Sequence, residues 1–158
     1  MSMEEIYLTK KGHERLVGEL EVLQNQKRRQ LSKAIGEARA HGDLSENAEY
    51  DAAKDAQAQN EERISALEFK LSHARIIDDE HMSKDEVLIG ATVTIQDLDT
   101  KETLVYMLVS ELEADYSQGK ISITSPVGKG LMNHKLRDEV EIEIPAGTLR
   151  YRITEISR

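Results

Sequence analysis

The stretch His41–Tyr50, HGDLSENAEY, gathers Asp43, Glu46 and Glu49 directly after Gly42. Long helical patterns without proline lie on either side of it. A glycine can end a helix in the left-handed conformation, so the stretch predicts a turn between two helices. Helices joined by a short connection lie antiparallel. The sequence therefore predicts a helical hairpin whose acidic tip is at residues 41–50.

The first arm of the hairpin is predicted to begin after Thr9, a good N-cap residue, and to run from about Lys10 to Ala40. An arm of this length spans roughly 45 Å at 1.5 Å per residue. Its apolar spacing slips between Leu23 and Leu31, which resembles a stutter in a heptad pattern.

The second arm follows a regular three-four spacing that is typical of a coiled coil. The seam is apolar far from the turn and polar in its middle, at Gln57 and Asn60. A polar seam favours a rod that projects into solvent or into a partner's cavity over a hairpin inside a larger bundle. The seam residues are Tyr50, Ala53, Gln57, Asn60, Ile64, Leu67, Leu71 and Ala74.

After residue 81 the helical period gives way to β-branched, alternating segments. Val140, Ile142 and Ile144 face one way and the glutamates between them face the other, which predicts a half-exposed antiparallel strand. A short helix is expected within residues 128–136. The predicted class is α+β, with a helical hairpin at 1–80 and a small antiparallel-sheet domain at 81–158. The strand segments are 87–98, 103–110, 120–125, 139–144 and 148–157.

Composition limits the classes of function. The formal net charge is −9 and the sequence pI is about 5.1, so the chain is a poor candidate for gripping DNA by itself. With no cysteine it has no disulfide and no thiolate zinc site. No signal peptide and no apolar run of membrane-spanning length is visible, so we expect a soluble, cytoplasmic protein.

The acids at the tip have two interpretations. Asp43 followed three residues later by Glu46 matches a capping box, in which the side chains satisfy backbone amides at a helix start. The same two carboxylates could complete a magnesium site, because Mg²⁺ often takes only one or two protein carboxylates. They are too few for a selective site of their own, so the other ligands would come from a partner. Both roles can coexist.

Basic residues lie behind the tip. Such a run is most often a solvated helix face, but a positive stripe in an acidic chain could also guide a single-stranded phosphate backbone. The candidates are Lys27, Arg28, Lys33, Arg39 and Lys54.

Three segments carry a resemblance to a known family. They are IYLTKKGHERLVGELEVL at 6–23, ARAHGDLSENAEYDAAK at 38–54 and ISITSPVGKGLM at 121–132. The chain resembles the bacterial Gre transcript cleavage factors of the GreA type, essentially from end to end. The resemblance implies a coiled-coil hairpin that enters the secondary channel of bacterial RNA polymerase. It also implies an FKBP-like C-terminal domain that docks at the rim of the channel.

The resemblance further implies roles for individual residues. Asp43 and Glu46 would hold the second catalytic Mg²⁺ of the polymerase and the attacking water, so the factor needs no cofactor and is not itself an enzyme. The polymerase would then cut the nascent RNA 3′ end of a backtracked complex. Contact with DNA would be indirect, through the elongation complex, and we expect a monomer. Arg39 and Lys54 match basic positions near the RNA, and Ser125 and Pro126 match a loop associated with polymerase docking.

Other functions remain open from the sequence. A non-cleaving regulator or inhibitor could block the polymerase channel with the same rod. A nuclease acting alone would need more carboxylates than this tip offers. Prolyl isomerase activity would need an apolar, aromatic-walled pocket, and this half offers only Tyr106, Tyr116 and Tyr151. Asp51 stands where the family commonly has histidine, which adds negative charge beside the tip.

Overall fold

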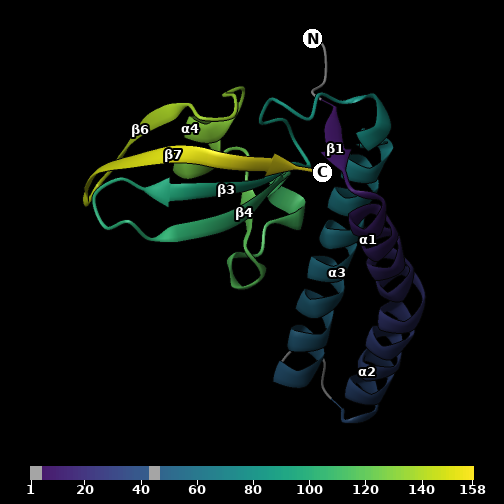
Figure 1. Cartoon of the computed structure of the whole chain (residues 1–158). Helices are drawn as coiled ribbons and strands as arrows, with labels where there is room; N and C mark the ends of the chain where they lie inside the picture. The colour runs from purple at the N-terminus through teal and green to yellow at the C-terminus, as the bar shows by residue number, and fades with distance from the viewer. Residues whose placement is uncertain (1–4, 43–46) are drawn as a thin grey trace. The chain divides into compact units, whose positions relative to one another are not determined.

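The structure, a computed structural model, describes residues 5–42 and 47–158 of the chain. It contains a helical hairpin and a curled β-sheet (Figure 1), so the predicted mixed α+β class is confirmed. Two compact units are present, one formed by residues 13–74 and the other by residues 5–12 together with 75–158. Residues 5–12, which include the first turn of α1 (Lys10–Val22), group with the C-terminal unit.

The first unit is an antiparallel hairpin. Its first arm consists of α1 (Lys10–Val22), a π-helix (Leu23–Lys27) and α2 (Arg28–Ala40), and its second arm is α3 (Ala48–Ser72). The arms lie side by side in Figure 1. Contacts between them pair Glu19 with Arg63, Arg28 with Glu61, and Ala38 with Asn47, so the two arms run in opposite directions.

The π-helix explains the break in the heptad pattern. The predicted slip between Leu23 and Leu31 falls on this segment, and a π-turn accommodates one extra residue within a helix. Asn60 of α3 lies beside it, where its Nδ2 donates a hydrogen bond to the Leu23 carbonyl at 3.2 Å. The insertion brings the apolar positions of α2 back to the face that packs on α3, where Leu31 and Ile35 are buried.

The buried face of the hairpin is narrow. On α3 only Asn60, Ile64 and Leu67 are buried, whereas the other predicted seam residues are half-buried. A long helix with so few buried side chains gains little from apolar burial. Polar contacts between the arms therefore carry a large share of what holds them in register.

Two short strands were missed by sequence reasoning. β1 (Ile6–Leu8) pairs with β2 (Ala74–Ile76), and Ile77 N donates to the Leu8 carbonyl at 2.8 Å. Strands of three residues carry too little periodicity to be recognised. After β1, Thr9 caps α1 as predicted, because Gly12 N donates to Thr9 Oγ1 at 3.0 Å.

The C-terminal unit contains a five-stranded sheet in the order β5-β4-β3-β7-β6. Each predicted strand segment matches one of these strands, although β7 begins one residue earlier than predicted. The alternation predicted for β6 is confirmed, with Val140 and Ile142 each 4 % exposed. The strands are β3 (Thr92–Asp97), β4 (Thr103–Val109), β5 (Lys120–Ser122), β6 (Glu139–Ile144) and β7 (Gly147–Ser157).

The prediction of a wholly antiparallel sheet is wrong at one pair of strands. β5 runs parallel to β4, with Leu108 opposite Ile121. The chain between them contains two 3-10 turns, η3 (Glu111–Glu113) and η4 (Tyr116–Gln118), and returns so that β5 takes the direction of β4. Local alternation of side chains does not reveal this return.

The short helix α4 (Pro126–Leu131) packs on the sheet next to β5 and β6. It begins two residues before the predicted interval, because Ser125 provides an N-cap and Pro126 a favourable first position. The helix lies so close that a Cβ on Gly128 would be 2.0 Å from the Ser122 carbonyl oxygen. The core between them consists of Val87, Ala91, Val93, Ile95, Leu108, Ile121, Leu131, Val140, Ile142, Tyr151 and Ile153.

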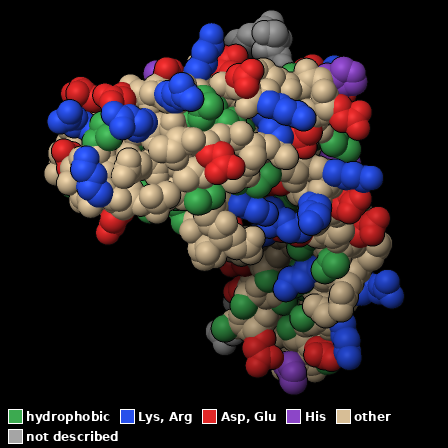
Figure 2. Space-filling model, viewed as in Figure 1, with side chains coloured by type: hydrophobic (Ala, Val, Ile, Leu, Met, Phe, Trp, Pro, Cys, Tyr) green, Lys and Arg blue, Asp and Glu red, His purple; other side chains and the backbone are tan. Residues whose placement is uncertain are grey.

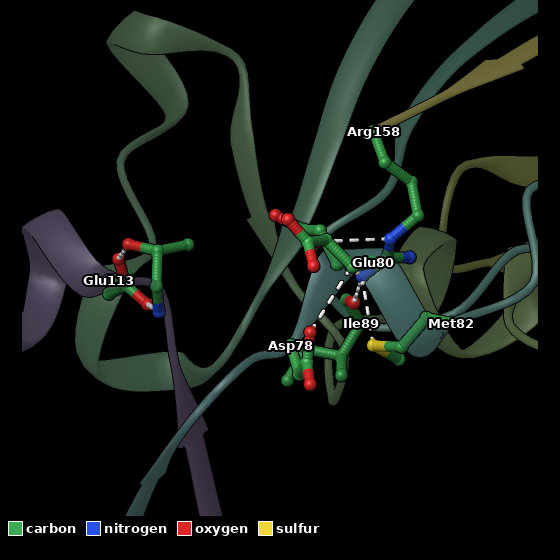
Figure 3. Close-up of polar contacts among 8 residues, drawn as sticks. Asp78, Glu80, Met82, Ile89, Glu113 and Arg158 are labelled. Carbon is green, nitrogen blue, oxygen red and sulfur yellow. Dashed lines mark hydrogen bonds and ion pairs between the residues drawn. The ribbon is translucent and has the colours of Figure 1, made fainter.

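Two charged side chains are buried in the C-terminal unit, and Figure 3 labels both. Glu113 is 5 % exposed, and its carboxylate accepts hydrogen bonds from Thr9 N at 2.9 Å and from Thr9 Oγ1 at 2.5 Å. The side chain of Arg158 is 2 % exposed, pairs with Asp79 at 3.0 Å and donates to the Ile89 carbonyl at 2.5 Å. A buried charge is tolerated only with such partners, so each of these residues ties distant segments together.

No helix in the part of the chain that the structure describes is both long enough and apolar enough to span a bilayer.

Candidate functional site at the distal end of the hairpin

The residue that caps α3 is Asn47. Its backbone is extended, and its Oδ1 accepts a hydrogen bond from Tyr50 N at 3.1 Å. The predicted capping box at Asp43 and Glu46 is therefore wrong, because the helix begins after Asn47, itself among the best N-cap residues. Asp43 and Glu46 lie outside the described residues.

The end of the first arm matches the prediction. α2 ends at Ala40, and Gly42 has a φ of 118°, a conformation that glycine adopts without strain. Gly42 N donates to the Arg39 carbonyl at 3.4 Å. The connection between the arms thus begins at the glycine that the sequence singled out.

Three contacts join the arms on either side of this connection. Asn47 Nδ2 donates to the Ala38 carbonyl at 2.6 Å. The Arg39 guanidinium lies over the Tyr50 ring, 5.8 Å from its centroid, and His41 Nε2 lies 3.7 Å from a Glu49 carboxylate oxygen. We refer to Ala38, Arg39, His41, Asn47, Glu49 and Tyr50 as the distal latch.

The predicted basic residues differ in how firmly they are engaged. Arg28 donates from Nε and Nη2 to the two carboxylate oxygens of Glu61, at 2.8 and 2.9 Å. This hydrogen bonding lowers the pKa of the Glu61 carboxyl and raises the pKa of Arg28. The ion pair between Lys33 and Glu37 is long, at 4.0 Å, and both side chains are largely exposed. The Lys33 ammonium is therefore much less constrained than the Arg28 guanidinium.

The remaining basic candidates are exposed. Lys27 lies on the π-helix, and Lys54 lies in α3, where its Nζ is 3.4 Å from Gln57 Oε1. Figure 2 shows Lys and Arg side chains distributed along the hairpin, with acidic side chains and a histidine at its distal end. An open groove beside the π-helix is lined by Gln24, Asn25, Arg28, Arg29 and Ser32.

Ser125 and Pro126, the predicted docking residues, form the start of α4. Ser125 Oγ accepts from Gly128 N at 3.1 Å and donates to the Ser122 carbonyl at 2.6 Å, so its hydroxyl already has two partners. Pro126 is exposed. A partner at this position would therefore contact the proline ring more readily than the serine hydroxyl.

Sequence reasoning predicted a candidate site at the tip but missed Asn47 and the distal latch. The signal for Asn47 was its position directly before the first residues of the α3 pattern. The contact with Ala38 has no signal in the sequence. Within residues 5–42 and 47–158, no three His, Asp or Glu side chains gather closely enough to hold a metal ion.

Comparison with known proteins assigns the family. The protein-family model described as "Transcription elongation factor, N-terminal" matches residues 6–76. The family model described as "Transcription elongation factor, GreA/GreB, C-term" matches residues 82–158. The transcription elongation factor GreA of Trichlorobacter lovleyi is 50% identical over 151 residues, which cover 96% of each chain. GreA of Beijerinckia indica is 47% identical over 155 residues, covering 98% of this chain and 99% of that relative.

Solved structures of similar proteins include GreA factor homolog 1 of Thermus thermophilus, with 32% identity, a TM-score of 0.44 and coverage of 98% of this chain and 100% of that one. A GreA/GreB elongation factor from Nitrosomonas europaea has 25% identity and a TM-score of 0.44, with coverage of 99% and 100%. Because both TM-scores are below 0.5, the assignment rests on the sequence matches, which span nearly the whole chain. The chain belongs to the GreA/GreB family of transcription elongation factors.

Proposed function

We propose that this chain binds bacterial RNA polymerase, inserts its hairpin into the secondary channel and stimulates the polymerase's own cleavage of nascent RNA in backtracked complexes. The observation that carries the proposal is the connection between α2 and α3. It contains Asp43 and Glu46 and joins two helix ends that the distal latch holds together. The family membership supports the same function.

The dimensions of the hairpin suit entry into a narrow channel. α3 has 25 residues, which corresponds to roughly 37 Å at 1.5 Å per residue. A pair of helices is the thinnest rod that can bury an apolar seam of its own. In this proposal the C-terminal unit, FKBP-like by family resemblance, docks at the channel rim around Ser125 and Pro126.

The donor chemistry of Asp43 and Glu46 fits a shared magnesium site. Two carboxylates provide hard oxygen ligands, and Mg²⁺ commonly binds one or two of these together with waters and substrate phosphates. When bound, Mg²⁺ supplies Lewis-acid stabilisation of a reacting phosphate and makes a bound water more acidic. Because Asn47 caps α3, the start of that helix does not require either carboxylate.

The basic side chains would guide the extruded RNA toward the tip. Lys27, Lys33 and Lys54 are exposed, and the contacts of Lys33 with Glu37 and of Lys54 with Gln57 are long enough to give way to a phosphate backbone. Arg39 lies at the tip beside Tyr50, and Arg28 is held by Glu61, so we expect Arg28 to contribute least. DNA would be contacted only through the elongation complex, and the factor would act as a cytoplasmic monomer without a cofactor of its own.

A stalled, backtracked elongation complex with 5′-labelled RNA tests the proposal. We expect the wild-type chain to accelerate shortening of the RNA in the presence of Mg²⁺. The double variant Asp43→Asn/Glu46→Gln should lower the rate to that of polymerase alone while polymerase binding, measured by competition, is unchanged. The physical reason is that an amide oxygen carries no charge to hold a divalent cation.

The matched control is Asp55→Asn/Glu62→Gln, which removes the same charge from exposed positions of α3 farther from the tip and should leave cleavage unchanged. Wild-type protein that binds polymerase without accelerating cleavage would instead identify a non-cleaving channel regulator. Cleavage of naked RNA by the isolated chain would identify a nuclease. Either result contradicts the proposal.

A further inference from the structure

Asn47 uses both ends of its side-chain amide, each on a different helix. Its Oδ1 accepts from Tyr50 N at 3.1 Å in the first turn of α3, and its Nδ2 donates to the Ala38 carbonyl at 2.6 Å in the last turn of α2. Helix ends leave backbone amides and carbonyls without partners in their own helix. A single side chain therefore satisfies one group at the start of α3 and one at the end of α2.

This double role is specific to asparagine among the good N-cap residues. Asp can accept from the helix amide but has no proton for the Ala38 carbonyl. Ser is one bond shorter, so its hydroxyl cannot place a donor where Nδ2 lies. Capping alone would be served by any of these residues. The contact with Ala38 is thus an additional function of Asn47.

The other members of the distal latch join the same two chain segments. Arg39 and His41 precede the connection, and their partners Tyr50 and Glu49 follow it. These two contacts involve exposed, long side chains and are weak individually. Of the three latch contacts, the short Asn47–Ala38 bond is the one that reaches the backbone of the other arm.

We infer that Asn47 is the positioning residue for the carboxylates of Asp43 and Glu46, an inference that rests on the proposed function. Asn47 fixes the last turn of α2 next to the first turn of α3, the two helix ends that the connection carrying Asp43 and Glu46 joins. Two ligands on a connection with fixed ends lose less entropy when they converge on a metal ion. Asn47 itself binds neither metal nor RNA.

Asn60 offers a matched control within the same hairpin. Its Nδ2 also donates to a backbone carbonyl of the other arm, that of Leu23, at 3.2 Å. It lies three to four helical turns away from Asn47 along α3. Both asparagines link the arms, but only Asn47 adjoins the tip acids, so their variants separate a local effect from general loosening of the hairpin.

The first measurement is the Mg²⁺ dependence of stimulated RNA cleavage, at saturating factor, relative to polymerase alone. For Asn47→Ser and Asn47→Asp we expect the Mg²⁺ concentration for half-maximal stimulation to rise about two- to tenfold, as expected for losing one hydrogen bond. The maximal rate should be recovered at high Mg²⁺. Asn60→Ser should behave as wild type. If Asn47→Ser and Asn47→Asp raise this Mg²⁺ concentration equally, the effect comes from the lost hydrogen-bond donor and not from the negative charge that Asp adds.

The second measurement does not involve catalysis. The chain has no cysteine, so nitroxide labels at Glu37→Cys and Ala52→Cys report the spacing of the arms near the tip without a background. By electron paramagnetic resonance on the free protein, Asn47→Ser should broaden this distance distribution and Asn60→Ser should not. Far-UV circular dichroism should show that all variants keep their helices.

Each outcome decides the inference. It is wrong if Asn47→Ser keeps the wild-type Mg²⁺ dependence, or if Asn60→Ser shifts that dependence equally. It is also wrong if the label distances do not respond to Asn47→Ser. If wild-type protein stimulates no cleavage, the proposed function fails first and the inference with it. If wild type is active and Asn47→Ser is indistinguishable from it, the inference alone fails.

Discussion

In the hairpin, a Cβ added at Gly36 would meet no atom within 4 Å, whereas in the C-terminal unit a Cβ added at Gly128 would lie 2.0 Å from a backbone oxygen. The same contrast runs through both units. The hairpin has a narrow buried seam and many solvated contacts between its arms, but the C-terminal unit has a closely packed core with buried charges. The C-terminal unit should therefore tolerate small changes poorly, and the hairpin should be limited more by backbone entropy than by packing.

The largest effect is expected for Gly128→Ala. The new methyl group would overlap the Ser122 carbonyl and crowd Ser125 Oγ, so α4 could keep its position only if β5 moved. We expect a loss of about 3 kcal/mol in the free energy of unfolding of the C-terminal unit. Hydrogen exchange measured by mass spectrometry should show faster exchange over residues 75–158 and unchanged exchange over residues 13–74.

Lys129→Ala is the control for this prediction, because Lys129 lies on the same helix with an exposed side chain. It should leave exchange in both units as in wild type. Wild-type protection in Gly128→Ala would mean that α4 is not packed as closely as the structure indicates.

A smaller and more local effect is expected for Glu113→Gln. The amide would turn N–H donors toward Thr9, whose N and Oγ1 both donate to the carboxylate. Leaving these buried donors poorly matched should cost about 2 kcal/mol. Exchange should rise in residues 5–12, the segment that Glu113 holds in the C-terminal unit.

Glu111→Gln provides the comparison, since Glu111 lies in the same 3-10 turn but is exposed. It should not change exchange in residues 5–12. Equal exchange in the two variants would show that Glu113 is not what holds this segment.

The sequence predicted those parts of the fold that depend on local pattern. Alternation at Val140 and Ile142 identified β6, and Gly42 identified the end of the first arm. Burial of Glu113 and Arg158 could not be predicted, because a charged residue by itself indicates exposure. Each of the two side chains occupies space left by a glycine. A Cβ on Gly12 would lie 1.9 Å from the Glu113 carboxylate, and a Cβ on Gly90 would lie 2.8 Å from Arg158 Nη2.

Near the candidate site, the sequence predicted where the first arm ends but not which residue caps α3. Asp43 and Asn47 are both residue types that can cap a helix, but the sequence analysis considered only Asp43. The structure has Asn47 at the start, with its side chain also bonded to Ala38 on the other arm. That bond joins segments whose proximity arises only when the hairpin closes, so no local pattern could predict it.

The smallest effect, of opposite sign, is expected for Gly36→Ala. Gly36 is an exposed position inside α2 with open space around it, so alanine adds no contact and only restricts the unfolded chain. We expect the hairpin to gain about 0.5–1 kcal/mol, seen as slower amide exchange across residues 28–40. Gly42→Ala is the comparison, because Gly42 also has open space around it but has a φ of 118°. Alanine is strained at this φ, so Gly42→Ala should destabilise the hairpin. If both substitutions lowered stability, backbone entropy would not be what limits the hairpin, and the contrast between the two units would have to be explained by packing alone.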